Sequence, residues 1–219
     1  ALAFCVYGLS EFYLASKNEN AKKTAVYIYN DILTHSYDEK FGGYIETLTR
    51  EWKPAIDLRL SEKDANEKKS MNTHLHLLEA FANLYRIWKD RSLEHRIVEI
   101  IRIFLDHIVD SKTGHLILFF DEAWKPKSNI ISYGHDIEAA WLIQEAAALI
   151  GDDFLLDEVK TRSVQMAQAA AKGLDGDGGL WYEYDVSQQQ LTREKHSWSQ
   201  AETMIGFFST WQVTGDEKF

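Results

Sequence analysis

Three segments of the sequence combine histidine with amide, hydroxyl and carboxylate side chains at helical spacing. His74 and His135 are 61 positions apart, and Trp198 follows His135 by another 63, so polar groups recur at a regular interval. Imidazole exchanges protons near neutral pH, which suits these segments to general acid–base catalysis. Regular recurrence predicts that they meet in one pocket. The segments are Met71-Asn-Thr-His-Leu-His76, Ser132-Tyr-Gly-His-Asp-Ile-Glu138 and His196-Ser-Trp-Ser-Gln-Ala-Glu202.

Within these segments the spacing pairs particular side chains on one helix face. Asn72 and His76 are four residues apart, while His76–Glu79 and His135–Glu138 are each three apart. A neighbouring carboxylate fixes the tautomer of an imidazole and raises its basicity. A helix N-terminus lowers the pKa of the imidazole and stabilises nearby anions. A histidine under both influences is expected to titrate near neutrality, where a general base works best.

Other interpretations of the histidines are structural roles or metal binding. A lone buried histidine is often a satisfied core residue, and His74 and His76 cannot point the same way, so one of them is a candidate for a structural role. The spacing does not match the metalloprotease helix motif, and no cysteine joins the set, which argues against a metal. No glycine-rich phosphate loop follows a strand, so we expect no cofactor. We interpret four more histidines as surface or capping residues: His35, His95, His107 and His115.

The elements that must position these residues are predicted to be helices. The segments 71–89 and 134–150 are apolar on nearly every face, which indicates helices buried all round. The segments 92–110 and 153–172 carry a single apolar stripe. Inner helix followed by outer helix is the pattern of a two-layered α/α toroid. Apolar periodicity places seven helices near 1–16, 19–35, 71–89, 92–110, 134–150, 153–172 and 198–213.

The links after the outer helices also recur. Phe41-Gly-Gly-Tyr44, Thr113-Gly-His-Leu116 and Gly176-Asp-Gly-Gly-Leu-Trp181 each lead into a short run of aromatic and β-branched residues, such as 116–120 and 180–184. Such segments predict turns with short strands or hairpins. No domain linker or low-complexity stretch interrupts the pattern, so we expect residues 1–219 to form a single all-α domain.

Composition narrows the classes of partner. Of the 219 residues, 45% are hydrophobic and 26% are charged, which is typical of a soluble globular protein. The net charge is −10 and no basic patch stands out, which argues against nucleic acid and anionic membranes as partners.

The single cysteine, Cys5, fits a reducing compartment, and we expect the cytoplasm. Residues 1–14 predict a buried helix rather than a signal peptide. Seven Trp and ten Tyr could hold a sugar, although most are expected to fill the core.

The polar segments resemble signatures of the cellobiose 2-epimerases, within the N-acylglucosamine 2-epimerase superfamily. Residues 71–80 with 83–88 resemble one signature, 132–138 is similar to a second, and 198–202 with 214–218 resembles a third. Tyr7-Gly-Leu-Ser-Glu11 and Gly42-Gly-Tyr44 also fit the family, so the resemblance runs the length of the chain.

The resemblance implies an (α/α)6 barrel and a cofactor-independent isomerase. The reaction would interconvert glucose and mannose at the reducing end of cellobiose or another β-1,4-linked disaccharide, by reversible epimerisation at C2. His135 matches one of two acid/base histidines, Glu138 would orient it, and Trp198 matches a platform for the sugar. The implied catalytic set is His135, Glu138 and His76, and the implied substrate-binding set is Asn72, His74, Trp198 and Tyr7.

The length departs from the family, because a twelve-helix barrel needs about twice as many residues. We therefore expect an internal fragment, inactive alone, with the second acid/base histidine beyond Phe219. Three alternatives stay open: an N-acylglucosamine or monosaccharide 2-epimerase, an α/α glycoside hydrolase, and a carbohydrate-binding toroid without catalysis. The hydrolase would need two facing carboxylates from Asp136, Glu138 and Glu202, whereas paired histidines favour proton transfer.

Overall fold

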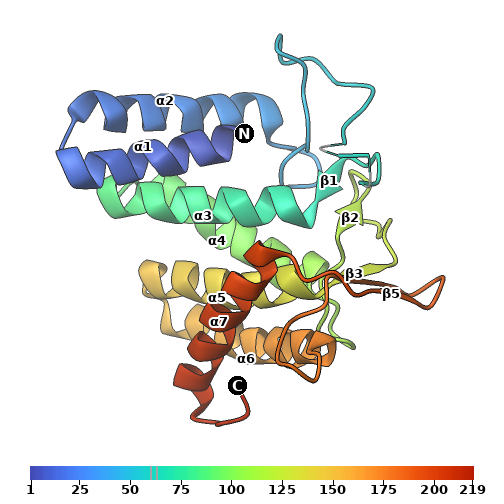
Figure 1. The fold of residues 1–219 in the computed structure, drawn as a ribbon. Helices are drawn as coiled ribbons and strands as arrows, with labels where there is room; N and C mark the ends of the chain where they lie inside the picture. Colours follow the sequence, from blue (N-terminus) through green and yellow to red (C-terminus); the bar gives the residue numbers. More distant parts are fainter. Residues whose placement is uncertain (60, 63) are drawn as a thin grey trace. The chain divides into compact units, whose positions relative to one another are not determined.

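The computed structural model describes residues 1–59, 61–62 and 64–219. The seven predicted helices are confirmed among these residues, with ends that differ by only a few positions. The segment predicted as one helix over 92–110 is α-helical to Ile103 and π-helical over Phe104–Ile108, and the sixth helix ends in a 3₁₀ turn. The helices are α1 (Leu2–Ser16), α2 (Glu19–Ser36), α3 (Met71–Ile87), α4 (Arg91–Ile103), α5 (Tyr133–Ile150), α6 (Asp153–Ala170) and α7 (Ser197–Thr214) (Figure 1).

The helices are divided between two compact units. The N-terminal unit comprises Ala1–Ile103 and Phe119–Lys127, and the C-terminal unit comprises Phe104–Leu118 and Ser128–Phe219. Each unit contains one of the helices predicted to be buried all round, α3 in the first and α5 in the second.

In the N-terminal unit, α3 is the central helix. It packs against α1, α2 and α4. Neighbouring elements cover the apolar surface of α3 on several sides, because four of its large side chains are fully buried: Leu75, Leu78, Phe81 and Leu84. By contrast, α4 buries a single stripe, as its one-sided pattern predicted.

The start of α3 is held between two loops by a buried lysine. Lys69 lies in strand β1 (Lys69–Ser70), which pairs antiparallel with β2 (Phe119–Phe120). Its side chain is 0% exposed, and its ammonium donates to Asp38 Oδ2 at 2.8 Å and to the carbonyls of Gly42 at 2.6 Å and Glu122 at 2.7 Å. A buried charge is tolerated because all three donors have acceptors.

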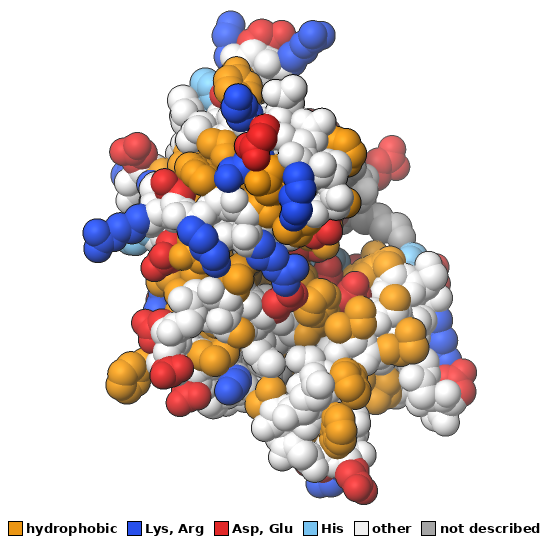
Figure 2. Space-filling model, turned by 90° about the vertical axis from the view of Figure 1, so that its left-hand side faces the viewer, with side chains coloured by type: hydrophobic (Ala, Val, Ile, Leu, Met, Phe, Trp, Pro, Cys, Tyr) orange, Lys and Arg blue, Asp and Glu red, His pale blue; other side chains and the backbone are white. Residues whose placement is uncertain are grey.

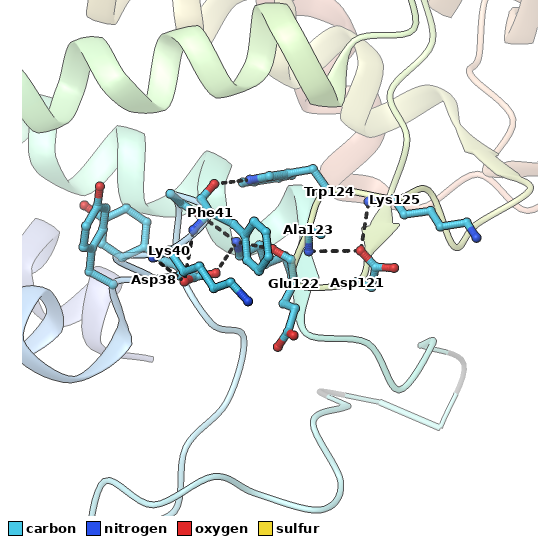
Figure 3. Close-up of polar contacts among 12 residues, drawn as sticks. Asp38, Lys40, Phe41, Asp121, Glu122, Ala123, Trp124 and Lys125 are labelled. Carbon is cyan, nitrogen blue, oxygen red and sulfur yellow. Dashed lines mark hydrogen bonds and ion pairs between the residues drawn. The ribbon is translucent and has the colours of Figure 1, made fainter.

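Figure 3 shows the two loops that face each other around this network. Asp38 and Phe41 lie on one loop, and Asp121, Glu122 and Trp124 on the other. The indole N–H of Trp124 donates to the Phe41 carbonyl at 2.9 Å. The Trp124 ring also lies 4.8 Å from the Lys69 ammonium, a cation–π distance. The loops are therefore joined to β1 and to each other.

In the C-terminal unit, α5 packs between α6 and α7. The contact with α7 uses small residues: Ser199, Thr203, Gly206 and Thr210 are the buried residues of that helix. A Cβ atom on Gly206 would lie 2.5 Å from Cγ1 of Ile137, so only glycine allows this approach. An antiparallel sheet in the order β3 (Ile130–Ser132), β4 (Glu183–Asp185), β5 (Gln190–Thr192) precedes the starts of α5 and α7.

The predicted recurrence of glycine turns is confirmed. Asp38, Asp110 and Asp175 each begin a turn, and their backbone N–H groups donate to the carbonyls of Gly43, His115 and Gly179 at 2.8–2.9 Å. A glycine with positive φ closes each turn: Gly43 at 76°, Gly114 at 78° and Gly178 at 84°. Isolated β-bridges flank the turns at Tyr37–Tyr44, Val109–Leu116 and Leu174–Leu180.

Two helices, α1 and α7, each leave several large apolar side chains exposed. On α1 these include Phe4 and Phe12; on α7, Met204 is 72% exposed, and Phe208 and Trp211 are also exposed. The face drawn in Figure 2 carries hydrophobic side chains in open view among charged ones. Exposed apolar patches of this kind favour association. Among the described residues, no helix has both the length and the apolar character needed to cross a membrane.

Candidate active site

The first turn of α3 places Asn72 and His76 on one wall of a cavity. The helix is capped by Ser70, whose side chain accepts the N–H of Thr73 at 3.0 Å. Asn72 and His76, four residues apart, both line a cavity of about 300 Å³ in the N-terminal unit. The predicted sharing of a face is confirmed, and the two side chains offer an amide and an imidazole to a ligand there.

The predicted pair of His76 and Glu79 also forms. Nδ1 of His76 lies 3.3 Å from Oε2 of Glu79, and its ring centroid is 4.7 Å from that of Phe4. Tyr7, another predicted substrate contact, lies half-buried on α1, where its backbone carbonyl accepts from Asn83 of α3 at 3.3 Å.

The structure gives His74 a structural role instead of the predicted contact with substrate. The side chain is fully buried, and both ring nitrogens are used: Nδ1–H donates to the Ser70 carbonyl at 2.7 Å, and Nε2 accepts the N–H of Tyr44 at 2.9 Å. Burial lowers the pKa of His74 to about 4, so the ring is neutral near pH 7. Through these two hydrogen bonds, His74 connects the backbone that follows Gly43 to the start of α3.

Glu46 is a cavity residue that sequence reasoning missed. Its carboxylate accepts the hydroxyl of Ser70, and it lines the same cavity as His76. Burial raises the pKa of Glu46, although the hydroxyl hydrogen bond opposes this effect. The signal in the sequence was its place directly after the glycine turn, two residues beyond Tyr44.

In the C-terminal unit, the starts of α5 and α7 approach closely at Gly134. A Cβ atom there would lie 2.7 Å from Cη2 of Trp198 and 2.8 Å from Cβ of Ser199. This approach brings the ring of His135 to 4.8 Å from that of Trp198. Two residues predicted to act on the sugar, 63 positions apart in the sequence, are thus neighbours in space.

His135 has a hydroxyl partner in the same turn. Oγ of Ser132 lies 2.8 Å from Nδ1 of His135. Glu138, predicted to orient His135, is buried one turn further along α5. The N-terminus of α5 surrounds His135 with backbone N–H groups that have no partner within the helix, which favours negative charge nearby.

His115 is buried, which makes its assignment as a surface or capping residue wrong. Its Nδ1 lies 2.6 Å from Oδ2 of Asp136, and Oδ1 of Asp136 accepts the N–H of Leu116 at 2.8 Å. Asp136 is fully buried; burial raises its pKa, while His115 and the Leu116 N–H act in the opposite direction. The turn at Gly114 folds the chain back, so that Asp136 joins the start of α5 to this loop.

Tyr182 and His196 lie beside Trp198 and form an aromatic cluster with it. Tyr182 stacks on His196 with ring centroids 4.0 Å apart and planes 13° apart, and its ring centroid lies 6.5 Å from that of Trp198 with the planes 85° apart. Part of each of these three residues stays accessible. Aromatic faces of this kind suit the apolar faces of a sugar. Among the described residues, no three His, Cys, Asp or Glu side chains are grouped as metal ligands.

The predicted meeting of the α3 set with the α5 and α7 set in one pocket stays a prediction. The structure shows Asn72 with His76 in one unit, and His135 with Trp198 in the other.

Comparison with known proteins decides the family. The sequence profile described as N-acylglucosamine 2-epimerase (GlcNAc 2-epimerase) matches residues 1–219. The chain belongs to this family.

Within the family, the chain is similar to cellobiose 2-epimerases. It is 48% identical over 216 residues to the cellobiose 2-epimerase of Bacteroides fragilis, covering 99% of this chain and 55% of that protein. It superposes on the cellobiose 2-epimerase of Bacillus thermoamylovorans with a TM-score of 0.92 at 35% identity, covering 99% of this chain and 55% of the other. A sugar epimerase from a ruminal bacterium gives a TM-score of 0.93 at 32% identity, again with 99% and 55% covered.

These matches confirm the predicted fold class. The chain has the all-α fold of the (α/α)6 epimerases, with short strands between the helix pairs. It spans about half the length of the curated relatives it matches.

Proposed function

We propose that the full-length protein containing residues 1–219 is a sugar 2-epimerase. It interconverts glucose and mannose at the reducing end of cellobiose or a similar β-1,4-linked disaccharide. The observation that carries the proposal is the contact between His135 and Trp198 at the adjoining starts of α5 and α7. The 48% identity to a cellobiose 2-epimerase supports this choice of substrate.

The proposed chemistry needs only proton transfer. Opening of the sugar ring gives an aldehyde, which makes the C2 hydrogen acidic. Removal of the C2 proton leaves its bonding electrons in an enediolate, with the negative charge on the oxygen of C1. A proton delivered to the opposite face of C2 then gives the other epimer. We assign one of the two transfers to His135, and we expect the second group outside this chain.

The surroundings of His135 suit both of its tasks. The positive end of the α5 helix dipole stabilises the enediolate charge, as donors do in an oxyanion hole. The same positive helix end disfavours the imidazolium, so a neutral ring is available to accept a proton. Stabilisation of the enediolate is the effect that lowers the barrier to removal of the C2 proton.

Binding of the disaccharide is assigned to two sets of side chains. Trp198 offers a face for stacking on a sugar ring, with the stacked pair of Tyr182 and His196 beside it. Asn72 and His76 supply hydrogen bonds from the cavity at the start of α3. Because the family profile runs through residues 1–219, we further propose that both units belong to one α/α-barrel epimerase domain.

A substrate panel tests the proposal. The full-length protein is incubated with cellobiose, N-acetylglucosamine and glucose, and products are separated by anion-exchange chromatography. We expect glucosyl-mannose from cellobiose, and loss of this product in His135→Ala but not in His95→Ala. His95 is the matched control because it is an exposed histidine on α4. Turnover of N-acetylglucosamine alone would assign the substrate class differently, and turnover of none would refute the proposal.

A further inference from the structure

Ser132 departs from the usual behaviour of a serine at the start of a helix. An N-cap serine ordinarily accepts a backbone N–H two or three residues on, as Ser70 does for Thr73 at the start of α3. Ser132 is the N-cap of α5 but makes no such hydrogen bond. Its Oγ is instead 2.8 Å from Nδ1 of His135. The hydroxyl of Ser132 therefore contacts the imidazole of His135 rather than a backbone N–H of the helix.

The position of Ser132 is fixed on several sides. It is fully buried and is the last residue of β3, where it pairs with Glu183 of β4. The ring of His135 is confined as well, because Trp198 lies 4.8 Å away and is itself pressed against Gly134. A short contact between two constrained groups sets the orientation of the imidazole.

We propose that Ser132 is a positioning residue that accepts a hydrogen bond from Nδ1–H of His135, so that Nε2 is the atom that exchanges a proton with C2. This inference rests on the proposed function, since it follows from the role of His135 as a base. A neutral imidazole carries one proton, and holding that proton on Nδ1 leaves the lone pair of Nε2 free.

The same hydrogen bond persists through the reaction. When Nε2 takes the proton from C2, both nitrogens of the imidazolium carry hydrogen, and Nδ1–H still donates to Ser132. The proton on Nε2 is therefore the only proton of this ring that moves: it passes to solvent after the forward reaction, or to C2 in the reverse reaction. Without the hydroxyl, the ring is free to adopt the Nε2–H tautomer, which cannot accept a proton from C2 at that nitrogen.

Two measurements on the full-length protein test the proposal. Long-range ¹H–¹⁵N correlation spectra of the ¹⁵N-histidine-labelled protein report the tautomer of each neutral ring, and His135→Gln assigns the signal. We expect His135 to be protonated on Nδ1, and Ser132→Ala to shift it toward Nε2–H. Kinetics with cellobiose should show kcat lowered about tenfold to hundredfold in Ser132→Ala, the effect of losing one hydrogen bond to a group that becomes charged in the reaction, with KM changed less than about twofold.

Matched variants separate positioning from a general effect of the mutation. Ser132→Thr keeps a hydroxyl and should retain most of kcat and the Nδ1–H tautomer. Ser163→Ala is the control: Ser163 is a buried serine of α6 in the same unit, and its hydroxyl has no hydrogen-bond partner among the residues that the structure describes. It should leave both the kinetics and the spectrum of His135 unchanged.

The possible outcomes separate a failure of the role of Ser132 from a failure of the proposed function. An Nε2–H tautomer in the unmodified protein would overturn the proposal, and so would Ser132→Ala with unchanged kcat and tautomer. If Ser132→Ala does not fold, the spectrum of the unmodified protein and the Thr variant still decide. If the unmodified protein does not epimerise any sugar while His135 is held as Nδ1–H, the proposed function fails and the role of Ser132 as hydrogen-bond acceptor stands.

Discussion

Replacing Lys69 by methionine should destabilise the N-terminal unit more than most single substitutions do. Methionine has a similar length and fills the same space, but it donates no hydrogen bond. The change leaves the Asp38 carboxylate, which is 13% exposed, without its cation, and leaves the carbonyls of Gly42 and Glu122 without their donor. Removing one partner of a buried ion pair costs about 3–5 kcal/mol. An unsatisfied buried acceptor costs about 1–3 kcal/mol where water cannot replace the donor.

The two costs overlap, because the same ammonium serves all three acceptors, so we expect a loss of about 3–5 kcal/mol. Urea unfolding followed by tryptophan fluorescence measures it, and Trp124 lies within 4.8 Å of the Lys69 ammonium as a local probe. Lys40→Met is the matched control, because Lys40 is exposed on the same loop and should change stability by less than about 0.5 kcal/mol.

A second variant distinguishes electrostatics from packing. Adding Asp38→Asn to Lys69→Met removes the unpaired charge and should recover about 1–2 kcal/mol, since the neutral amide is less costly to bury. A loss below about 1 kcal/mol for Lys69→Met, at an unchanged urea m-value, would refute the account of Lys69 as the group that joins the two loops to β1.

Two further predictions concern pH and association. His74 has its pKa lowered to about 4 in the folded state, against an ordinary value of 6.5, so the unfolded chain binds more protons between these pH values. Stability should therefore fall by up to about 3 kcal/mol as pH drops from 7 to 4, and His74→Gln should flatten this part of the profile of unfolding free energy against pH; a profile unchanged by the substitution would contradict the assignment. The exposed apolar face of α7 should make the 219-residue chain self-associate, and Met204→Lys with Phe208→Lys should reduce the sedimentation coefficient toward that of a monomer; a monomeric chain with a sharp, reversible thermal transition before any substitution would argue against it.

The helices and turns could be predicted from the sequence because their signals are local. Apolar residues at helical spacing define α3 and α5, and the face shared by Asn72 and His76 follows from a separation of four residues. The glycine turns were predictable because a residue with positive φ is required at each. The repeat of these local signals was enough to indicate the fold class.

What the sequence did not predict depends on contacts between distant residues. Lys69 ends a polar run that is typical of an exposed loop, and its burial follows from acceptors 27 to 53 positions away. His115 lies in a glycine turn, and the carboxylate that it contacts belongs to Asp136, 21 positions further along the chain. For His74 and His76, spacing showed that they differ in direction, but only the contacts of Tyr44 and Ser70 show which one is structural.

The most direct test of the central claim is hydrogen exchange at C2 of the sugar. The full-length protein and its His135→Ala variant are incubated with cellobiose in deuterium oxide, and ¹H NMR follows both the formation of glucosyl-mannose and the loss of the C2 proton signal. The account predicts epimer formation with deuterium at C2 for the unmodified protein, and a loss of at least about 10²-fold in both rates for His135→Ala, with weaker effects on sugar binding. Full epimerase activity in His135→Ala, or epimer formed without deuterium at C2, would contradict it.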